Sequence, residues 1–462
     1  MIARIGSPMP YVSRQLFGGK GKNLLEIGEE FSVPEGFVVS SEEYVKFFLT
    51  NNLRGVIQQI LRDHKAPEDI ESRAKEAFAQ ARFPSNIEDV LFRELEILQE
   101  QAAKTNDPQA VRSSAIDEDG SINSFAGQHD TFFGKLTEQT MLEYVKLCYA
   151  SAFNSVALKY REEHKLGLPT GMAVVIQNMK EFETGFVVYT AAPFDYENLI
   201  IEAAPGHCKS VVDGRPVDSF RVNIRDKNKI ISKINKNKSM QWQYDHQEGK
   251  LKLVPTPSHF VDKPSLSPEQ IAKITEVVLD IESCYALGFP KDRKPQDLEG
   301  GFDYKGKLWI TQSRDITGMS YKAPDIVLPK LTTIIGQSQN VGNTGVYDGP
   351  IVVITDVDPN GTTFTLKDGQ EIRSLDSKFT TGYVLVTPET NPTLDSYIKN
   401  CKAIIATECG IMSHAGATAR ERGLIFIGCV ESTDHKQLQD KLDHGDIVCV
   451  GANKEKGVIG YR

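Results

Sequence analysis

The chain has 462 residues, of which 40% are hydrophobic and 25% charged, and its 53 Lys and Arg against 62 Asp and Glu give a formal net charge of −9. These fractions are ordinary for a globular protein and exclude a wholly disordered or fibrous chain. The longest apolar runs, such as 403–406, are too short to cross a bilayer, and residues 1–12 lack the apolar core of a secretory signal. The mild acidity argues against a broad nucleic-acid surface. We therefore expect a cytoplasmic protein of about two or three domains, without membrane or nucleic-acid partners.

Cysteine usage supports the same compartment. The seven cysteines are widely spaced and contain no Cys-x-x-Cys pair, so neither a zinc ribbon nor a thioredoxin-type motif is indicated. A chain of this length does not need disulfides for stability, so we expect reduced thiols.

A Pro-containing stretch at 318–335 divides the chain into two styles of sequence. Pro324 and Pro329 block helix continuation and favour extended backbone, which is typical of a linker. The region before it, 1–317, is long and mixed, with helical patterns at 41–50 and 87–103. A unit of this size usually contains two lobes.

The region after the linker, 336–462, begins with Gly-, Asn- and Asp-rich strands that suggest a β-layer. It then alternates strands with helices, a pattern that predicts parallel strand pairing and an α/β layer. The predicted strands are 383–387, 403–407 and 424–427, and the predicted helices are 394–400 and 414–422.

Two segments near the N-terminus carry residues suited to phosphate. In FGGKGKNL, glycines allow close backbone approach and Lys20 supplies positive charge, although the segment does not fit the Walker A pattern. In VRSSA, Arg112 stands beside two hydroxyls, and the small-residue stretch 124–131 that follows could cover a triphosphate. Taken alone, the first segment could equally be a Gly-rich turn with solvated lysines, and the second a polar β-hairpin.

A third segment combines oxygen and guanidinium groups. Glu299 in QDLE and Gln312 in LWITQSR belong to two strand-like pieces joined by a hairpin signal at 303–307. The alternation predicts that Glu299 and Gln312 project on one face, where their oxygens suit Mg²⁺ and the nearby Arg314 suits phosphate. The alternative is a solvent-facing hairpin with a polar pair.

A candidate nucleophile lies in SHAGATARERG. Ser413 can cap a new helix, and Gly423 can end it, with Arg420 and Arg422 favourably placed near its C-terminal end. His414 would then lie in the first turn, where free N–H groups and the helix dipole attract anions and the small residues leave room for a phosphoryl group. A neutral imidazole is nucleophilic. For a single histidine, the more common explanation is local hydrogen bonding.

Together and in this order, the motifs resemble the dikinase family that includes phosphoenolpyruvate synthase, pyruvate phosphate dikinase and rifampicin phosphotransferase. The resemblance covers nearly the whole chain. The segments that carry it are GGKGKNL, VRSSA with SFAGQ, VIQNM, IEAAPG, QDLEGG with TQSRDIT, LVTPETNP, and AIIATECGIMSHAGATARERG.

The resemblance implies a fold and a chemistry. It implies an ATP-grasp-type nucleotide-binding domain of α+β class at 1–317, followed by a small swivelling β/β/α phosphohistidine domain of α/β class at 336–462. In this family His414 would take the β-phosphoryl group of ATP, and ATP would leave as AMP.

The resemblance also implies roles for individual residues. Gly127 and Thr131 would lie in the covering loop, Gln177 and Met179 at the adenine edge, and Glu202 near the ribose. The residues expected to hold the ATP phosphates and Mg²⁺, with Glu299 and Gln312 as metal ligands, are Lys20, Arg112, Glu299, Gln312 and Arg314.

Some positions depart from the family pattern. Asp315 stands where Pro is usual, Cys409 replaces the first Gly of the pair before the histidine, and Gly416 replaces an Ala. None of these changes removes a charge-bearing residue, so we expect activity to survive. We find no barrel domain for phosphoenolpyruvate and pyruvate in this sequence, so the phosphoryl acceptor, a small molecule or a protein, is not located.

Three functions follow as hypotheses. The first is an ATP-dependent phosphotransferase working through His414 with an unidentified acceptor. The second is a phosphohistidine carrier, or a subunit of a split dikinase that donates phosphate to a partner protein. The third, a nucleotide-binding remnant without turnover, is disfavoured because the charged site residues are all retained.

Overall fold

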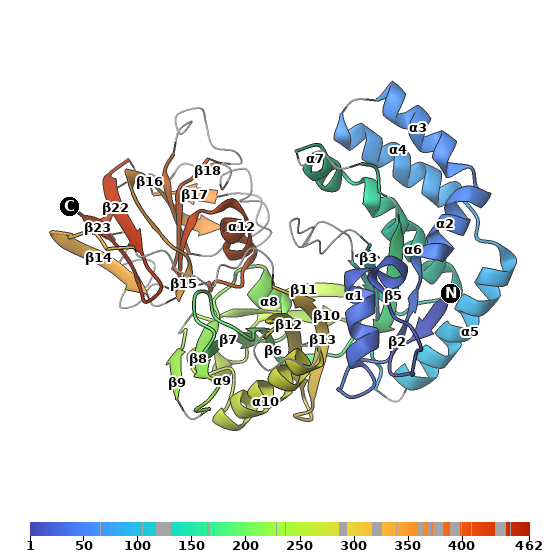
Figure 1. Cartoon of the computed structure of the whole chain (residues 1–462), viewed down its shortest axis with the longest axis horizontal. Coiled ribbons are helices and arrows are strands. Elements are labelled where there is room, and N and C mark those ends of the chain that lie inside the picture. Colours follow the sequence, from blue (N-terminus) through green and yellow to red (C-terminus); the bar gives the residue numbers. More distant parts are fainter. Residues whose placement is uncertain are drawn as a thin grey trace. The chain divides into compact units, whose positions relative to one another are not determined.

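The computed structural model, whose helices and strands are drawn in Figure 1, contains two compact units, each built from several stretches of chain. The first unit comprises 1–181, 244–252 and 305–317, and the second comprises 182–243, 253–304 and 318–462. The division at 181/182 falls inside the predicted region 1–317, which therefore contributes to both units. The structure describes residues 1–64, 66–103, 105–116, 131–163, 167–169, 171–227, 229–235, 237–285, 293–316, 326–338, 340–357, 364–367, 369, 371–372, 382–388, 398, 400–407, 409–429, 440–443 and 445–462.

The first unit is an antiparallel five-stranded sheet of order β1-β2-β5-β3-β4 with helices packed against it. Its core is rich in aromatic side chains, with Phe47, Phe78 and Tyr149 packed together. Local sequence starts several of its helices: Thr137 and Thr140 form a capping box at α6, and Pro67 occupies the first turn of α4. The elements are β1 (Ile2–Arg4), α1 (Arg14–Ile27), β2 (Gly36–Val39), α2 (Ser41–Thr50), α3 (Leu53–Asp63), α4 (Pro67–Gln80), α5 (Ser85–Ala102), β3 (Gln109–Ala115), β4 (Thr131–Gly134), α6 (Glu138–Ala150), the 3₁₀ turn η1 (Ser151–Phe153), α7 (Ser155–Glu163), β5 (Met172–Asn178) and β13 (Leu308–Asp315).

The second unit contains an antiparallel sheet in which β12, β6, β7, β8 and β9 lie side by side. The two-stranded β10-β11 sheet has its turn in the first unit and its outer ends in the second. The elements are β6 (Phe182–Tyr189), β7 (Asn198–Pro205), α8 (Lys209–Val212), β8 (Asp218–Asn223), β9 (Ile230–Lys233), β10 (Met240–Asp245), β11 (Lys250–Pro255), α9 (Ser258–Val261), α10 (Pro268–Tyr285) and β12 (Gln296–Asp303).

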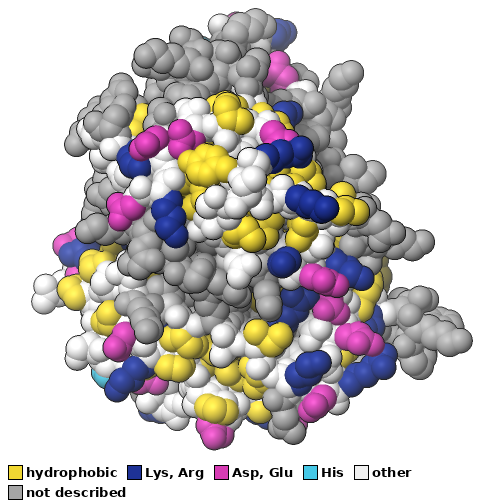
Figure 2. All heavy atoms as spheres, turned by 90° about the vertical axis from the view of Figure 1, so that its left-hand side faces the viewer, with side chains coloured by type: hydrophobic (Ala, Val, Ile, Leu, Met, Phe, Trp, Pro, Cys, Tyr) yellow, Lys and Arg dark blue, Asp and Glu magenta, His cyan; other side chains and the backbone are white. Residues whose placement is uncertain are grey.

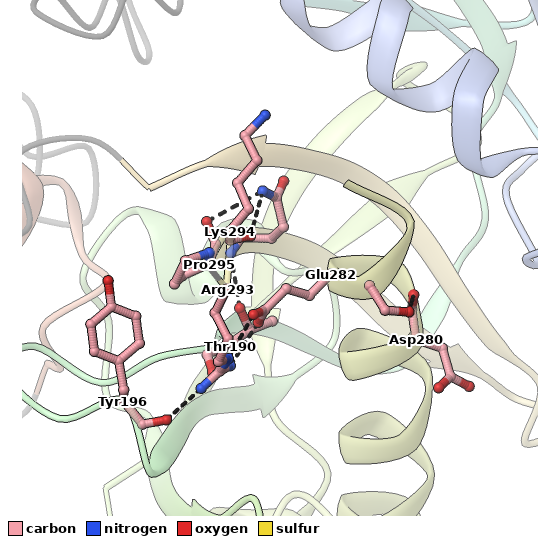
Figure 3. Close-up of polar contacts among 9 residues, drawn as sticks. Thr190, Tyr196, Asp280, Glu282, Arg293, Lys294 and Pro295 are labelled. Carbon is pink, nitrogen blue, oxygen red and sulfur yellow. Dashed lines mark hydrogen bonds and ion pairs between the residues drawn. The ribbon is translucent and has the colours of Figure 1, made fainter. Parts of the chain in front are cut away.

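An ion pair between the half-buried Arg293 and the buried Glu282 anchors the start of β12 (Figure 3). The Arg293 guanidinium donates to both carboxylate oxygens of Glu282 on α10, each at 2.7 Å. It also donates to the backbone oxygens of Thr190, at 2.6 Å, and Tyr196. The side chain of Thr190 in turn accepts the N–H of Gln296 at 2.8 Å. This branched set of hydrogen bonds from Arg293, called the Arg293 fork below, therefore links α10 to the end of β6 and, through Thr190, to the first residue of β12.

The C-terminal part of the second unit is a mixed sheet of order β14-β23-β22-β16-β19-β20-β21-β15, with β17 paired to β16 and β18 paired to β17. Strands β16, β19, β20 and β21 pair in parallel, and the aliphatic side chains of this sheet form one core. The elements are β14 (Thr333–Ser338), β15 (Asn340–Asn343), β16 (Gly345–Val357), β17 (Phe364–Leu366), β18 (Glu371–Ile372), β19 (Val384–Thr387), β20 (Ala403–Ala406), α12 (His414–Arg422), β21 (Ile425–Gly428), β22 (Ile447–Ala452) and β23 (Gly457–Tyr461).

The predicted parallel α/β layer is confirmed, with α12 spanning the predicted 414–422. Helix α2 also matches its prediction, and α5 begins two residues earlier than predicted. The last three residues of the predicted linker 318–335 belong to strand β14, because Thr333, Ile334 and Gly336 pair with β23. Most of the predicted helix 394–400 lies outside the described residues.

The surface seen in Figure 2 mixes basic and acidic side chains among hydrophobic ones. On that face no single sign of charge dominates, which agrees with the mild net charge of the sequence. Within the described residues, no helix is both long enough and apolar enough to span a membrane.

Candidate functional site

The glycine motif lies inside helix α1, at a kink. Gly18 has a φ of 64° and interrupts the helical backbone. A Cβ at Gly18 would lie 2.1 Å from the backbone oxygen of Ser114, so only glycine lets α1 approach β3 this closely. The Ser114 hydroxyl completes the contact by donating to the oxygen of Phe17 at 2.9 Å and accepting the N–H of Gly21 at 3.0 Å. The motif is therefore a kinked helix locked onto a strand, and the half-buried Lys20 projects from it.

Arg112 brings three predicted site residues together in the first unit. Its guanidinium donates to the side-chain oxygens of Gln177 at 3.1 Å and Gln312 at 2.7 Å, and to the backbone oxygen of Thr311 at 2.8 Å. Strand β3 pairs with β5 so that Arg112 lies opposite Val175, while Gln312 comes from β13. Distant parts of the chain thus converge on one guanidinium.

The same cluster contains a buried donor suited to a ligand. Gln177 is 3% exposed, and its Nε2 has no hydrogen-bond partner in the described part of the chain. A buried N–H group without a partner is costly, so an acceptor on a bound molecule would stabilise it. Met179, two residues further on, is buried beside Ala110 and Tyr244. This combination of an amide donor, apolar neighbours and a guanidinium fits a nucleotide.

The remaining predicted ligands are distributed over both units. Thr131 is exposed on β4 opposite Arg112, and Arg314 lies half-buried near the end of β13. Glu299 is half-buried on β12 of the second unit, where the Cys208 thiol lies 3.9 Å from its Oε2. The proposed metal pair of Glu299 and Gln312 is therefore divided between the units and stays a prediction. Gly127 lies outside the described residues.

Among the residues that the structure describes, no group of three His, Cys, Asp or Glu side chains could hold a metal ion. Mg²⁺ commonly takes only one or two protein ligands and completes its shell with substrate phosphates and water, so a sparse protein ligand set fits it.

His414 is the first residue of α12, as the sequence predicts. The Ser413 hydroxyl caps the helix by accepting the N–H of Gly416 at 3.3 Å, and Gly423 ends it with a φ of 67°. His414 itself is half-buried. His414 therefore belongs to the first turn of the helix, where backbone N–H groups and the positive end of the helix dipole favour negative charge.

The loop before His414 is held by side chains that sequence reasoning did not connect with it. The carboxylate of Glu202 on β7 accepts the N–H groups of Ile411 at 2.7 Å and Met412 at 3.1 Å. Arg420 on α12 donates to the backbone oxygen of Ile411 at 2.5 Å and to the hydroxyl of Tyr189 on β6. All these residues belong to the second unit.

Glu202 is fully buried by this contact. Burial raises the pKa of its carboxyl to about 7, against the opposing effects of the two N–H donors and the Arg420 charge. The sequence suggested a place near a ribose, whereas the structure covers this carboxylate with the loop that precedes His414. No local pattern signals the contact, because its partners are more than two hundred residues apart.

Comparison with known proteins supports the assignment of both regions. Residues 14–331 match the model of the pyruvate phosphate dikinase AMP/ATP-binding domain, and residues 379–454 match that of the mobile domain of PEP-utilising enzymes. The chain belongs to the dikinase family. Enzymes of this family are phosphotransferases that use a phosphohistidine intermediate.

Individual dikinase relatives are similar over most of this chain. The probable phosphoenolpyruvate synthase of Methanothermobacter thermautotrophicus is 28% identical over 95% of the chain and 60% of the relative. That of Archaeoglobus fulgidus is 31% identical over 96% of the chain and 56% of the relative. The phosphoenolpyruvate synthase of Aeropyrum pernix is 27% identical over 92% of the chain and 54% of the relative. The chain thus spans a little over half the length of these relatives.

Proposed function

We propose that this dikinase-family chain is an ATP-dependent phosphotransferase that phosphorylates His414 and passes the phosphoryl group to an acceptor. The observation that carries the proposal is the position of His414 as the first residue of α12, within the matched mobile domain. A helix N-terminus stabilises the negative charge of a phosphoryl group through its free N–H groups and its dipole.

The residues of the first unit would bind ATP. Lys20, Arg112 and Arg314 would neutralise the phosphates, and Gln177 and Met179 would border the adenine; the unpartnered Nε2 of Gln177 supports this role. Thr131 and Gly127 would contribute to a covering segment, in an ATP-grasp arrangement. Glu299 and Gln312 would hold Mg²⁺, which reduces the negative charge of the phosphates when it is bound.

The chemical step is a displacement at phosphorus. A nitrogen of the neutral His414 imidazole attacks the β-phosphorus of ATP and forms an N–P bond. The bond between that phosphorus and the oxygen bridging to the α-phosphate breaks, and its electron pair leaves on AMP, so that His414 first carries the β- and γ-phosphoryl groups together. Attack of water or inorganic phosphate at the γ-phosphorus would then break the β–γ bridge, release phosphate or pyrophosphate, and leave the β-phosphoryl group on His414. Arg112 would stabilise the charge on these phosphates, and its hydrogen bonds to Gln177 and Gln312 support this role because they already orient the guanidinium.

The deciding experiment compares His414→Ala with the wild-type protein after incubation with β-labelled ATP and Mg²⁺. Wild type should acquire base-stable, acid-labile label and release AMP, whereas His414→Ala should acquire no label and keep its ATP affinity. His259→Ala, which removes an exposed histidine from α9, is the matched control and should label normally. Label of the same lability in His414→Ala would refute the assignment.

Pyruvate is the first acceptor to test, because the relatives are described as phosphoenolpyruvate synthases. Transfer of label from the phosphorylated protein to pyruvate alone would support a complete enzyme. Transfer that requires a second protein would support the alternative, a phosphohistidine donor within a split dikinase.

A further inference from the structure

Strand register places Glu202 and the candidate metal ligand Glu299 on one face of the same sheet. Glu299 pairs with Val187, and Val187 pairs with Glu202 on its other side. Directly paired residues of neighbouring strands project to the same face, and strands lie about 4.7–4.9 Å apart. The backbones at the two glutamates are therefore about 10 Å apart, and Tyr189 projects from the same face two residues beyond Val187.

The loop that presents His414 contacts this face at two points. At one, the Glu202 carboxylate accepts consecutive N–H groups from Ile411 and Met412. At the other, Arg420 joins the Tyr189 hydroxyl to the backbone oxygen of Ile411. Met412 is two residues from His414, so the contacts fix the backbone at the start of α12.

The fit between the loop and Glu202 is close. A Cβ at Gly410 would lie 1.8 Å from Oε1 of Glu202, so any side chain larger than hydrogen would displace the carboxylate. Gly410 has no positive φ, so its own backbone conformation does not require glycine. Its lack of a side chain therefore serves the contact with Glu202.

We propose that Glu202 is a positioning residue that docks the His414 loop on the sheet face carrying Glu299. The inference rests on the proposed function, because it assigns Glu202 to the delivery of His414 toward the metal-bound phosphates. Phosphoryl transfer requires the reacting atoms to come within about 3–3.5 Å of each other. Two hydrogen bonds close to His414 limit the displacement of its backbone, so they should hold the imidazole nitrogen near the phosphorus that it attacks. With the loop in place, the carboxylate is covered and cannot also bind a ribose hydroxyl.

The first test uses Gly410→Ala, which obstructs docking without changing any proposed ATP ligand. We expect the single-turnover rate of His414 phosphorylation at saturating ATP to fall about tenfold, the effect of roughly one lost hydrogen bond. ATP affinity and melting temperature should stay unchanged. Gly167→Ala is the matched control, because a Cβ there meets no atom of the described residues within 4 Å. An unchanged phosphorylation rate in Gly410→Ala would overturn the proposal.

The second test distinguishes positioning from ribose binding. Glu202→Gln should lower the rate at saturating ATP with little change in ATP affinity, and Gly410→Ala should have a much smaller effect in a Glu202→Ala background. If Glu202→Gln weakens ATP binding and Gly410→Ala phosphorylates His414 at the wild-type rate, Glu202 would instead be a ribose ligand.

A third measurement does not depend on catalysis. Hydrogen exchange at the amides of Ile411 and Met412, without ATP, should be faster in Gly410→Ala than in wild type. If wild type acquires no phosphate but this acceleration is seen, the proposed function fails while docking stands. Equal exchange in both proteins would refute docking itself.

Discussion

The protonation of the Glu202 carboxyl group should determine how stably the His414 loop is docked. Its pKa is raised from 4.5 to about 7 when the loop covers it, mainly by burial. Around it lie the N–H groups of Ile411 and Met412, the Arg420 guanidinium, and Glu299 across Val187 on the same face. The docked state therefore binds a proton more tightly than the open state.

The sign of the pH dependence follows from this difference. A group whose pKa is raised in the docked state favours docking fully below its ordinary pKa of 4.5, and this contribution is lost as the pH rises to about 7. We expect protection of the Ile411 and Met412 amides, corrected for the intrinsic pH dependence of exchange, to decline between about pH 5 and 7 and then level off. The same profile in Glu202→Gln should be flat; an identical decline in that variant would assign the effect to another group.

At the scale of elements, the anchoring of β12 matters because this strand carries Glu299. Arg293 donates hydrogen bonds to the buried Glu282 and to the backbone oxygens of Thr190 and Tyr196 (Figure 3). Removing one partner of a buried ion pair leaves the other charge without compensation, at a typical cost of about 3–5 kcal/mol. Arg293 keeps 23% of its side chain exposed, so solvent should reduce this cost.

We therefore expect Arg293→Ala to destabilise the second unit by about 2–3 kcal/mol, lowering its thermal midpoint by several degrees. Arg73→Ala is the control, because Arg73 and Glu76 form an ion pair with both side chains more than half exposed, and such pairs contribute little. Calorimetry of the two variants checks the difference. Equal midpoints would mean that the fork does not anchor β12.

At the scale of the whole molecule, we expect the proposed reaction to involve movement between the two units. Lys20 and Arg112 belong to the first unit, His414 to the second, and the acceptor would have to be reached after the phosphoryl group leaves ATP. Interfaces between domains are usually modest and polar, so relative motion is the ordinary expectation. The predicted linker at 318–335 is the candidate pivot, and the domain boundaries at 317 and 336 stay predictions.

Spin-label distances would detect this movement. Leu49 on α2 and Ile447 at the start of β22 are exposed and belong to different units, and Cys284 is the one exposed cysteine among the seven, all of them described. The labels would be attached to Leu49→Cys and Ile447→Cys in a Cys284→Ser background. We expect more than one population of distances between the two labels, and we expect ATP with Mg²⁺ to change their proportions. A control pair at Tyr11 and Leu49, within the first unit, should be unaffected. One unchanging distance between 49 and 447 would argue against a swivelling transfer.

The sequence alone determined the features that depend on neighbouring residues. Ser413, His414 and Gly423 specify the start and end of α12 through capping chemistry, and the alternation of apolar runs specifies the parallel layer of β19, β20 and β21. The family motifs likewise pointed to Arg112 and His414, because each motif is a short run whose residues act together.

The tertiary structure decided which distant residues meet. Arg112 reaches Gln177 and Gln312, which are 65 and 200 positions away, and Glu202 reaches Ile411, which is 209 positions away. Such contacts depend on strand order and register, and a shift of one residue would turn Glu202 to the opposite face of its sheet. Local propensity carries no information about that register, so the role of Glu202 beside the His414 loop became visible only once the strands were paired.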